Sequence, residues 1–342
     1  HDCYPGNRTD AEQFSTCLPT IEHFLDAAQI PRQKVTLVFD KGNNSEEAFD
    51  TLDDSDFHFV GSLVGSHHRD LWDVPLKKYR QLKGERLQSV RAYRTSREVF
   101  GQERTVVVTY NENLLEGQMQ GITRSLEKAR QKLRDIQTRL RRRWDGRVTG
   151  GRHPTKASIT KQATAASSGQ FLKDLIRFEV TDDKIPWLTF EMDATALSRL
   201  IRTQLGKTIL FTDNDDWTDE EIILAYRSQH HVEDAFRQMK HPHYLGWSPM
   251  FHWTDSKIRV HAFTCVLALT LSSLLQRTLH QGGIDLSLPR MFELLGGIRE
   301  TLVIYPRKRG QKKYPTKASL STLSDEQQKL LKTLRLQRHL SS

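Results

Sequence analysis

The chain has 342 residues, of which 37% are hydrophobic and 27% are charged, and its formal net charge is +9. This length suits two or three domains, and the composition excludes a disordered chain, which would have too few apolar residues to form a core. The three cysteines are too few and too scattered for a disulfide framework or a cysteine-rich zinc site, and they fit a reducing compartment.

The first part of the chain alternates helix and strand signals. Residues 9–28 begin with a capping box and predict a helix. Short apolar strands are predicted at 34–40 and 57–64, with a helix at 45–52 between them. This order predicts an α/β fold in which helices cover the strands.

The middle of the chain predicts a long helix. From Leu115 to Leu140 apolar residues recur at alternating steps of four and three, which is an uninterrupted heptad pattern. Such a helix needs a packing partner, and we expect an antiparallel hairpin with residues 157–176. Residues 65–206 are therefore expected to form a mostly helical domain inserted into the α/β core. Other elements of the middle region are strands at 105–111, 187–193 and 207–213 and a helix at 194–204.

The excess of positive over negative charge is concentrated between residues 124 and 156. This window contains twelve lysines or arginines and three acids, so it accounts for the whole net charge. A concentrated basic surface predicts a polyanionic partner, most often nucleic acid, and the alternative is a solvated helix face. Arg141, Arg142 and Arg143 are predicted DNA contacts, made to phosphates rather than to bases.

The apolar run at 260–275 lies in a predicted helix at 256–279. The run is shorter than the roughly 20 residues that a membrane span needs, and it contains His261 and two serines. We therefore interpret it as a buried core helix and expect no membrane partner. The rest of the chain, 281–342, is expected to be helical and basic, with a basic run at 307–313.

The stretch AYRSQHHVEDAFRQMKH, 225–241, predicts a helix with an ordered polar stripe. Tyr226, Glu233 and Lys240 are spaced seven residues apart, so they lie within about 40° of one another on a helix. The apolar residues centre roughly 100° away, so the stripe borders the buried face. Helix geometry alone favours a surface helix in which Glu233 pairs with Arg237.

Asp40 supplies a carboxylate at the end of the strand predicted at 34–40. The carboxyl end of a buried strand is where α/β sheets bind ligands, although an aspartate before Lys-Gly also fits a plain turn. Asp40 and Glu233 together would form an oxygen site for Mg²⁺ or Mn²⁺, which in a basic chain favours metal-dependent phosphoryl transfer on DNA. Asp213, after another predicted strand, is interpreted as a capping and turn residue.

The segments LVFDKGNNSEE and YRSQHHVEDAFRQMK resemble two motif blocks of bacterial insertion-sequence transposases with a DDE active site. These enzymes carry the signature Tyr-x2-Arg-x3-Glu-x6-Lys, whose spacing Tyr226, Glu233 and Lys240 match, and YPGNRTD near the start is also similar. The resemblance runs from residue 1 to about 280. It implies a ribonuclease H-like core interrupted by an insertion domain.

The same resemblance implies a site and a reaction. Asp40 and Glu233 would be the second and third metal-binding acids, holding two Mg²⁺ or Mn²⁺ ions. Tyr226 and Lys240 would contact DNA at the element's end, with Arg237 nearby on the same helix. The implied enzyme hydrolyses a phosphodiester there, and the freed 3′-hydroxyl attacks target DNA. Double-stranded DNA, a homodimer on paired ends and the bacterial cytoplasm are the expected partner, assembly and location.

Two features depart from the family's pattern. The signature arginine position is Gln229, whose amide can hydrogen-bond a phosphate without supplying charge, and Arg227 lies about 160° away around a helix. The family's first aspartate lies on a strand upstream of the YPGN block. The chain is therefore expected to be truncated before that block, to lack this acid and to cleave DNA weakly or not at all.

These predictions divide the chain into four parts and leave three candidate functions. The leading function is a DNA transposase. The alternatives are a metal-dependent nuclease of the same fold and a non-catalytic DNA-binding derivative, which Gln229 and the absent first acid favour. The predicted parts are the first piece of the core at 1–64, the insertion domain at 65–206, the second piece of the core with the glutamate helix at 207–280, and the C-terminal region at 281–342.

Overall fold

A computed structural model of the chain describes residues 3–4, 6–241, 245–248, 250–308 and 313–339. The chain divides into two compact units. One unit is Arg8–Arg227, and the other joins His1–Asn7 to Ser228–Ser342. The division therefore falls inside the stretch that was predicted to be a single helix.

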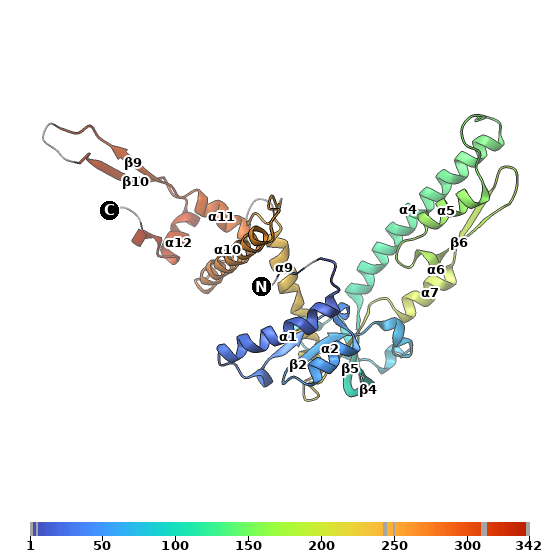
Figure 1. Ribbon diagram of the computed structural model, residues 1–342, viewed down its shortest axis with the longest axis horizontal. Helices are drawn as coiled ribbons and strands as arrows, with labels where there is room; N and C mark the ends of the chain where they lie inside the picture. The colour runs from blue at the N-terminus through green and yellow to red at the C-terminus, as the bar shows by residue number, and fades with distance from the viewer. Residues whose placement is uncertain (1–2, 5, 242–244, 249, 309–312, 340–342) are drawn as a thin grey trace. The chain divides into compact units, whose positions relative to one another are not determined.

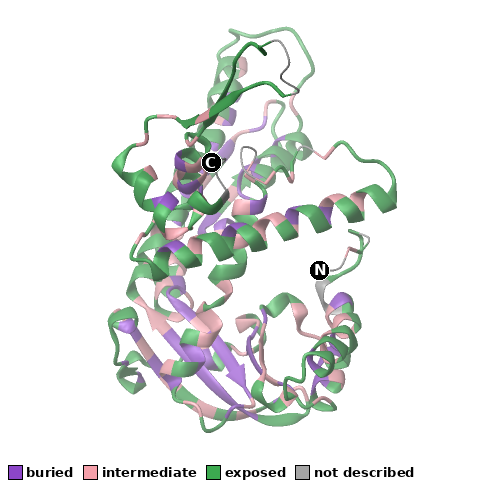
Figure 2. Cartoon of the chain, turned by 90° about the vertical axis from the view of Figure 1, so that its left-hand side faces the viewer, coloured by how far each residue is buried: buried purple, intermediate pink, exposed green. Residues whose placement is uncertain are grey.

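A six-stranded mixed sheet forms the centre of the first unit, in the order β1-β2-β8-β5-β4-β3 (Figure 1). β1 and β2 are parallel, and all other neighbouring strands are antiparallel. The central strands β2, β8 and β5 are the most buried, and Figure 2 shows buried strands in the middle of the sheet. The strands are β1 (Thr36–Val38), β2 (His58–Ser62), β3 (Arg80–Gln81), β4 (Val90–Val99), β5 (Gln102–Asn111) and β8 (Lys207–Thr212).

Helices cover both faces of this sheet. On one face lie α1 (Asp10–Ala27) and α2 (Glu46–Asp53), and on the other lies α8 (Asp219–Arg227). Side chains alternate along a strand, so Val108 of β5 packs on the α1–α2 side and its neighbour Val107 packs on the α8 side. The fold is thus mixed α/β, with strands covered by helices.

Between β5 and β8 the chain folds around one long helix, α4 (Glu112–Trp144). Figure 1 shows α5 (Lys156–Ala166) beside it. The predicted heptad pattern is confirmed, because its apolar residues form one continuous buried face of α4 that packs on the neighbouring elements. The remaining partners are α6 (Leu172–Leu175), β6 (Ile176–Val180), β7 (Leu188–Met192) and α7 (Ala194–Thr203). The buried residues of the stripe are Ile122, Leu126, Ala129, Leu133, Ile136 and Leu140.

The sheet continues beyond the boundary predicted at residue 65. Strands β3, β4 and β5 extend it, and β4 was not predicted from the sequence. The exposed residues of β4 are Arg94, Ser96 and Glu98, and the polar residues between its buried ends hide the apolar alternation. The turn to β5 is Phe100-Gly101, with φ of 50° and 72°, and this dipeptide is not among the common hairpin signals although its two positive φ values match a type I′ turn.

The second unit contains four helices among its described residues and a two-stranded ribbon. Leu279, Met291 and Leu330 are fully buried in its core. Residues 309–312 of the predicted basic run lie outside the described residues. The elements are α9 (Gln229–Met239), α10 (Asp255–Gln281), α11 (Leu288–Gly296), β9 (Glu300–Ile304), β10 (Thr316–Leu320) and α12 (Asp325–Thr333).

The interpretation of the 256–279 helix as a buried core helix is wrong. Cys265 and Leu279 lie on the buried side of α10, but the opposite side carries apolar side chains that the described residues leave exposed. The apolar residues surround this helix, and only one side of it packs on its neighbours. By length and composition α10 is the one helix in the described part of the chain that is apolar enough to cross a membrane. The exposed residues include Val260, Phe263, Leu267, Leu271 and Leu274.

Gly61 of β2 marks a close approach of aromatic rings. A Cβ atom added there would lie 2.7 Å from Phe211 Cε1 and 2.9 Å from Phe39 Cε2. We expect Gly61→Ala to lower the free energy of unfolding by about 1–3 kcal/mol, because the rings would have to move in a packed core. Urea unfolding measures this change. The control is Gly117→Ala in α4, where the added Cβ meets nothing within 4 Å; it should be neutral or stabilise by about 0.5–1 kcal/mol. An equal loss of unfolding free energy in the two variants would contradict the packing explanation.

Candidate active site

Asp40 follows β1 at the carboxyl edge of the two parallel strands. The preceding residue, Phe39, is buried, and its ring packs on Phe59 with centroids 5.8 Å apart. Asp40 itself is exposed and begins a short 3-10 turn, Lys41–Asn43. The buried ring therefore fixes the backbone, while the carboxylate projects from the end of the strand.

Three donors converge on a single oxygen of Asp40. Oδ1 accepts from the Lys41 backbone amide at 2.7 Å, from Ser62 Oγ at 3.0 Å and from Tyr226 Oη at 3.3 Å. Among the described residues no hydrogen bond to Oδ2 is found. One carboxylate oxygen is thus held in place, and the other is available to a ligand.

Ser62, the last residue of β2, supports Asp40 from the neighbouring strand. Its side chain is almost completely buried, donates to Asp40 and accepts from the Lys41 amide at 3.2 Å. Asn44 Nδ2 donates to the Ser62 carbonyl at 2.9 Å, and the buried Asn44 Oδ1 has no hydrogen-bond partner in the described part of the chain. Sequence reasoning missed Ser62, although the rule that singled out Asp40 applies equally to the end of the next parallel strand.

Tyr226 reaches Asp40 from α8, a helix that is fixed at its start. A capping box begins this helix, since Glu221 N donates to Thr218 Oγ1 at 3.3 Å and Thr218 N donates to Glu221 Oε2 at 2.8 Å. The structure therefore brings together Asp40 and Tyr226, two predicted site residues 186 positions apart.

The first turn of α8 is also attached to the sheet. Asp219 is 2% exposed and accepts from Arg80 Nε at 3.0 Å on β3 and from an Arg94 guanidinium nitrogen at 3.3 Å on β4. A buried carboxylate needs such partners, because burying an unpaired charge is costly. These two arginines hold α8 against the sheet and so fix the position of the helix that carries Tyr226.

The single helix predicted across the polar stripe is wrong. α8 and α9 are separated at Ser228, where the amide of His231 donates to the Ser228 carbonyl at 3.0 Å, three residues back instead of four. Tyr226 belongs to α8 and the first unit. Glu233, in α9, and Lys240, its C-cap, belong to the second unit. Of the three residues of the predicted stripe, only Glu233 and Lys240 therefore belong to the same helix and the same unit.

Glu233 is exposed on α9, and the ion pair predicted for it is wrong. Arg237 pairs with Asp234 at 2.5 Å, three residues back, instead of with Glu233. No ion pair of the Glu233 carboxylate is found within the described ranges. Lys240 is also exposed, and its Nζ lies 6.0 Å from the centre of the Phe236 ring. Carboxylate and ammonium are thus both accessible on this helix.

Gln229 and Arg227 differ in their hydrogen bonding. The side-chain nitrogen of Gln229 is buried and has no hydrogen-bond partner among the described residues. Arg227 donates to the Arg86 carbonyl at 3.0 Å, and burial lowers the pKa of its guanidinium. Arg227 thus makes a structural contact in the first unit, which fits the prediction that it is a poor substitute for the signature arginine.

Asp213 lies at the other end of the parallel strand pair. Its carboxylate accepts from the Phe59 amide at 2.8 Å and lies 2.9 Å from His58 Nδ1, at the start of β2. Asp40 lies beyond the opposite ends of β1 and β2. Asp213 was predicted to be a capping and turn residue, but its carboxylate instead bonds the start of the neighbouring strand β2.

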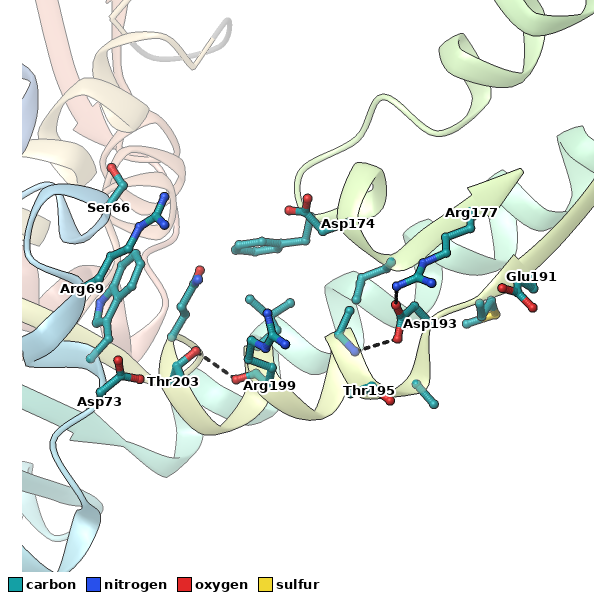
Figure 3. Close-up of a pocket in the computed structure, with 18 residues that line it drawn as sticks. Ser66, Arg69, Asp73, Asp174, Arg177, Glu191, Asp193, Thr195, Arg199 and Thr203 are labelled. Carbon is teal, nitrogen blue, oxygen red and sulfur yellow. Dashed lines mark hydrogen bonds and ion pairs between the residues drawn. The ribbon is translucent and has the colours of Figure 1, made fainter. Parts of the chain in front are cut away.

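A groove of about 880 Å³ lies in the first unit between the region after β2 and the residues around α6 and α7 (Figure 3). Its charges are mixed, so it does not select phosphate, and Asp40 does not line it. Asp193 caps α7, and the Ala196 amide, followed by Arg177, lowers the pKa of its carboxyl. Because Asp40 is exposed and does not line this groove, the predicted site lies at an exposed edge of the sheet. The charged lining residues are Arg69, Asp73, Asp174, Arg177, Glu191, Asp193 and Arg199.

The three predicted DNA contacts on α4 lie in its last turn. Arg141 and Arg142 are exposed, whereas Arg143 is half-buried and donates to the Gly150 carbonyl at 2.8 Å. These residues are far along the chain from Asp40 and are not among its hydrogen-bond partners.

The donors around Asp40 suit a hard cation, because its carboxylate, the Ser62 hydroxyl and the Asn44 amide all present oxygen. Among the described residues, however, no group of three or more histidine, cysteine, aspartate or glutamate side chains is arranged to hold a metal ion. Asp40 by itself therefore supplies one carboxylate of such a site.

Comparison with known proteins adds one finding. No curated protein and no solved structure is detectably similar to the chain. A family model described as "Transposase DDE domain" matches residues 2–271, a range that includes Asp40, Tyr226 and Glu233. This match covers well over half of the sequence. The chain therefore belongs to the transposase DDE domain family, whose general function is DNA transposition.

Proposed function

We propose that the protein is a DNA transposase that cleaves strands at insertion-sequence ends and transfers them to target DNA. The observation that carries this proposal is the hydrogen bond from Tyr226 to Asp40, which joins two positions of the family's motifs across 186 residues. Family membership supports the general activity. The assignment of roles to single residues is our inference from this site.

Asp40 and Glu233 are the proposed metal ligands, with Mg²⁺ or Mn²⁺ as the ions and two ions as the expected number. The free Oδ2 of Asp40 and the exposed carboxylate of Glu233 are donors of the kind that these cations prefer. When bound, the ions would supply Lewis-acid stabilisation of the charge that develops on the phosphate.

The surrounding residues orient the carboxylate and the DNA. Ser62 and the Lys41 amide hold Oδ1 of Asp40. The Tyr226 bond is longer and weaker at 3.3 Å, so its hydroxyl can turn to a phosphate oxygen when DNA binds. Lys240 would place a positive charge against the backbone. Gln229, where the family has arginine, would contact a phosphate only after its buried amide nitrogen becomes exposed.

A strand-transfer assay with the product of the full reading frame tests this proposal. The substrate is DNA carrying the ends of the element that encodes the chain, incubated with Mg²⁺ or Mn²⁺. Cleavage followed by joining supports the transposase. Cleavage without joining would instead indicate a nuclease.

The second candidate function is a non-catalytic DNA-binding derivative, which the neutral Gln229 at the arginine position favours. It predicts tight, salt-sensitive DNA binding that needs no divalent metal and no cleavage under any metal condition. This result in the same assay would overturn the transposase proposal.

Removing the Ser62 hydroxyl should weaken the site without removing a ligand. We expect Ser62→Ala to lower the cleavage rate about 10–100-fold and to raise the Mg²⁺ concentration required, because groups that orient a metal ligand typically have effects of this size. A Mg²⁺ titration of initial cleavage rates measures both changes. Ser96→Ala is the control, since Ser96 Oγ bonds Glu103 on the β4–β5 hairpin. An unchanged Mg²⁺ requirement in Ser62→Ala would refute this role.

A further inference from the structure

The helix α4 has two flanks of different charge beside its buried stripe. At 100° per residue, one flank carries four cations and a single acid, Asp135. We call it the cationic flank, and its cations are Lys128, Lys132, Arg139 and Arg143. The other, balanced flank carries three arginines and three glutamates, Arg130, Arg134, Arg141, Glu112, Glu116 and Glu127.

The neighbours of α4 increase this difference. On the cationic flank Arg139 donates to Gln162 of α5 at 2.8 Å, so α5 lies on that side. From residue 146 to residue 173 the sequence has no acid, and Lys156 and Lys161 of α5 are exposed. Lys156 lies 3.9 Å from Asp182, which is a weak ion pair.

The opposite side of α4 faces an acidic hairpin. Gln137, which points toward the balanced flank, donates to the Leu188 carbonyl of β7 at 2.8 Å. The hairpin residues 176–193 contain five acids and two basic residues. One side of this folded segment is therefore strongly positive, and the other is negative.

We propose that the cationic flank, continued by α5, binds the sugar–phosphate backbone of duplex DNA as a second contact surface, separate from the Asp40 site. The inference rests on the proposed function in taking DNA as the ligand. Lys128 and Arg143 are fifteen residues apart, or about 22 Å along a helix axis, which matches between about six and seven base-pair steps. The cations would contact phosphates, so this surface would hold DNA without reading its sequence.

A charge-matched pair of variants of the full chain tests the surface. One variant replaces Lys128, Lys132 and Arg139 by glutamine. The control replaces three other cations of α4 by glutamine, and both variants lose three positive charges. The control positions are Arg124, Arg130 and Arg134, none of which is a predicted DNA contact. Fluorescence anisotropy with a 30-base-pair duplex of arbitrary sequence, in EDTA and at several KCl concentrations, measures the affinity and its salt dependence.

The cationic-flank variant should lose most of this binding. Each phosphate contact contributes about 0.9 to the slope of log affinity against log salt, so the slope should fall by about 3 and the affinity at 150 mM KCl by about 100-fold or more. The control should change the slope by less than about 1. Equal effects of the two variants would overturn the proposal and indicate a solvated helix face.

A second variant, circular dichroism and metal-free conditions distinguish a loss of DNA binding from misfolding and from a loss of catalysis. Arg139 makes a hydrogen bond within the protein, so a Lys128→Glu/Lys132→Glu variant, which leaves that bond intact, must also reduce the slope. Circular dichroism confirms the helix content of each variant. Because binding is measured without metal, a protein that fails to cleave DNA can still show the flank effect, and an active transposase can lack it.

Discussion

In the product of the full reading frame, an Asp40→Asn substitution is expected to lower the rate of DNA strand cleavage by at least about 10³-fold, the equivalent of about 4 kcal/mol. Asparagine keeps the shape and can still accept from Ser62 and the Lys41 amide, but it removes the negative charge that attracts a divalent cation. Glu233→Gln should have an effect of the same size. A gel assay of labelled element ends over a range of Mn²⁺ and Mg²⁺ concentrations measures both.

Two acids provide matched controls for this prediction. Asp213→Asn changes a carboxylate at the opposite end of the parallel strand pair, and Asp234→Asn changes the residue next to Glu233 on α9. Both should retain cleavage within about tenfold, and all four variants should still bind DNA in EDTA. Loss of cleavage in Asp234→Asn as severe as in Glu233→Gln would show that the charge of α9, rather than a specific ligand, is required.

Local signals in the sequence predicted the parts of the structure that depend on short-range physics. The heptad pattern of α4 is confirmed, because the stripe is buried from Ile122 to Leu140 and only its first two residues, Leu115 and Met119, are half-buried. The capping box predicted at the start of residues 9–28 is likewise confirmed, since its two hydrogen bonds join Thr9 and Glu12, only three residues apart. Asp40 was singled out by its place at a strand end, which the parallel pairing of β1 and β2 supports.

The errors concern features that depend on distant partners. The polar stripe assumed one straight helix, but a single short-range bond at Ser228 divides it, and composition gives no sign of that break. The core-helix interpretation of α10 rested on the length and composition of its apolar run, whereas burial depends on what packs against each side. Ser62 was missed because its role appears only when two strand ends lie side by side.

The aromatic core under Asp40 contains a buried charge, Arg104. This residue is 3% exposed, and its guanidinium lies 5.1 Å from the centre of the Phe49 ring and 4.9 Å from that of Phe59. It pairs with Asp53 at 2.6 Å and donates from Nε to the Val99 carbonyl at 2.9 Å. Because Phe59 also packs on Phe39, this ion pair supports the ring that anchors the end of β1.

Removing the partner of this charge should destabilise the first unit strongly. We expect Asp53→Ala to lower the free energy of unfolding by about 3–5 kcal/mol, because it leaves a buried guanidinium unpaired. Urea unfolding followed by circular dichroism measures the loss. Asp54→Ala, one residue further on the exposed end of α2, is the control and should change stability by less than about 0.5 kcal/mol.

A compensating substitution separates the unpaired charge from other causes. Replacing a whole buried ion pair by apolar side chains is often neutral, so Arg104→Met in the Asp53→Ala background should recover part of the lost stability. Arg104→Met alone should cost less than Asp53→Ala, since Asp53 is partly exposed and can be hydrated. If the double variant is instead as unstable as the sum of the single variants, the charge is not the cause, and the packing of Arg104 between the rings of Phe49 and Phe59 must supply the stability.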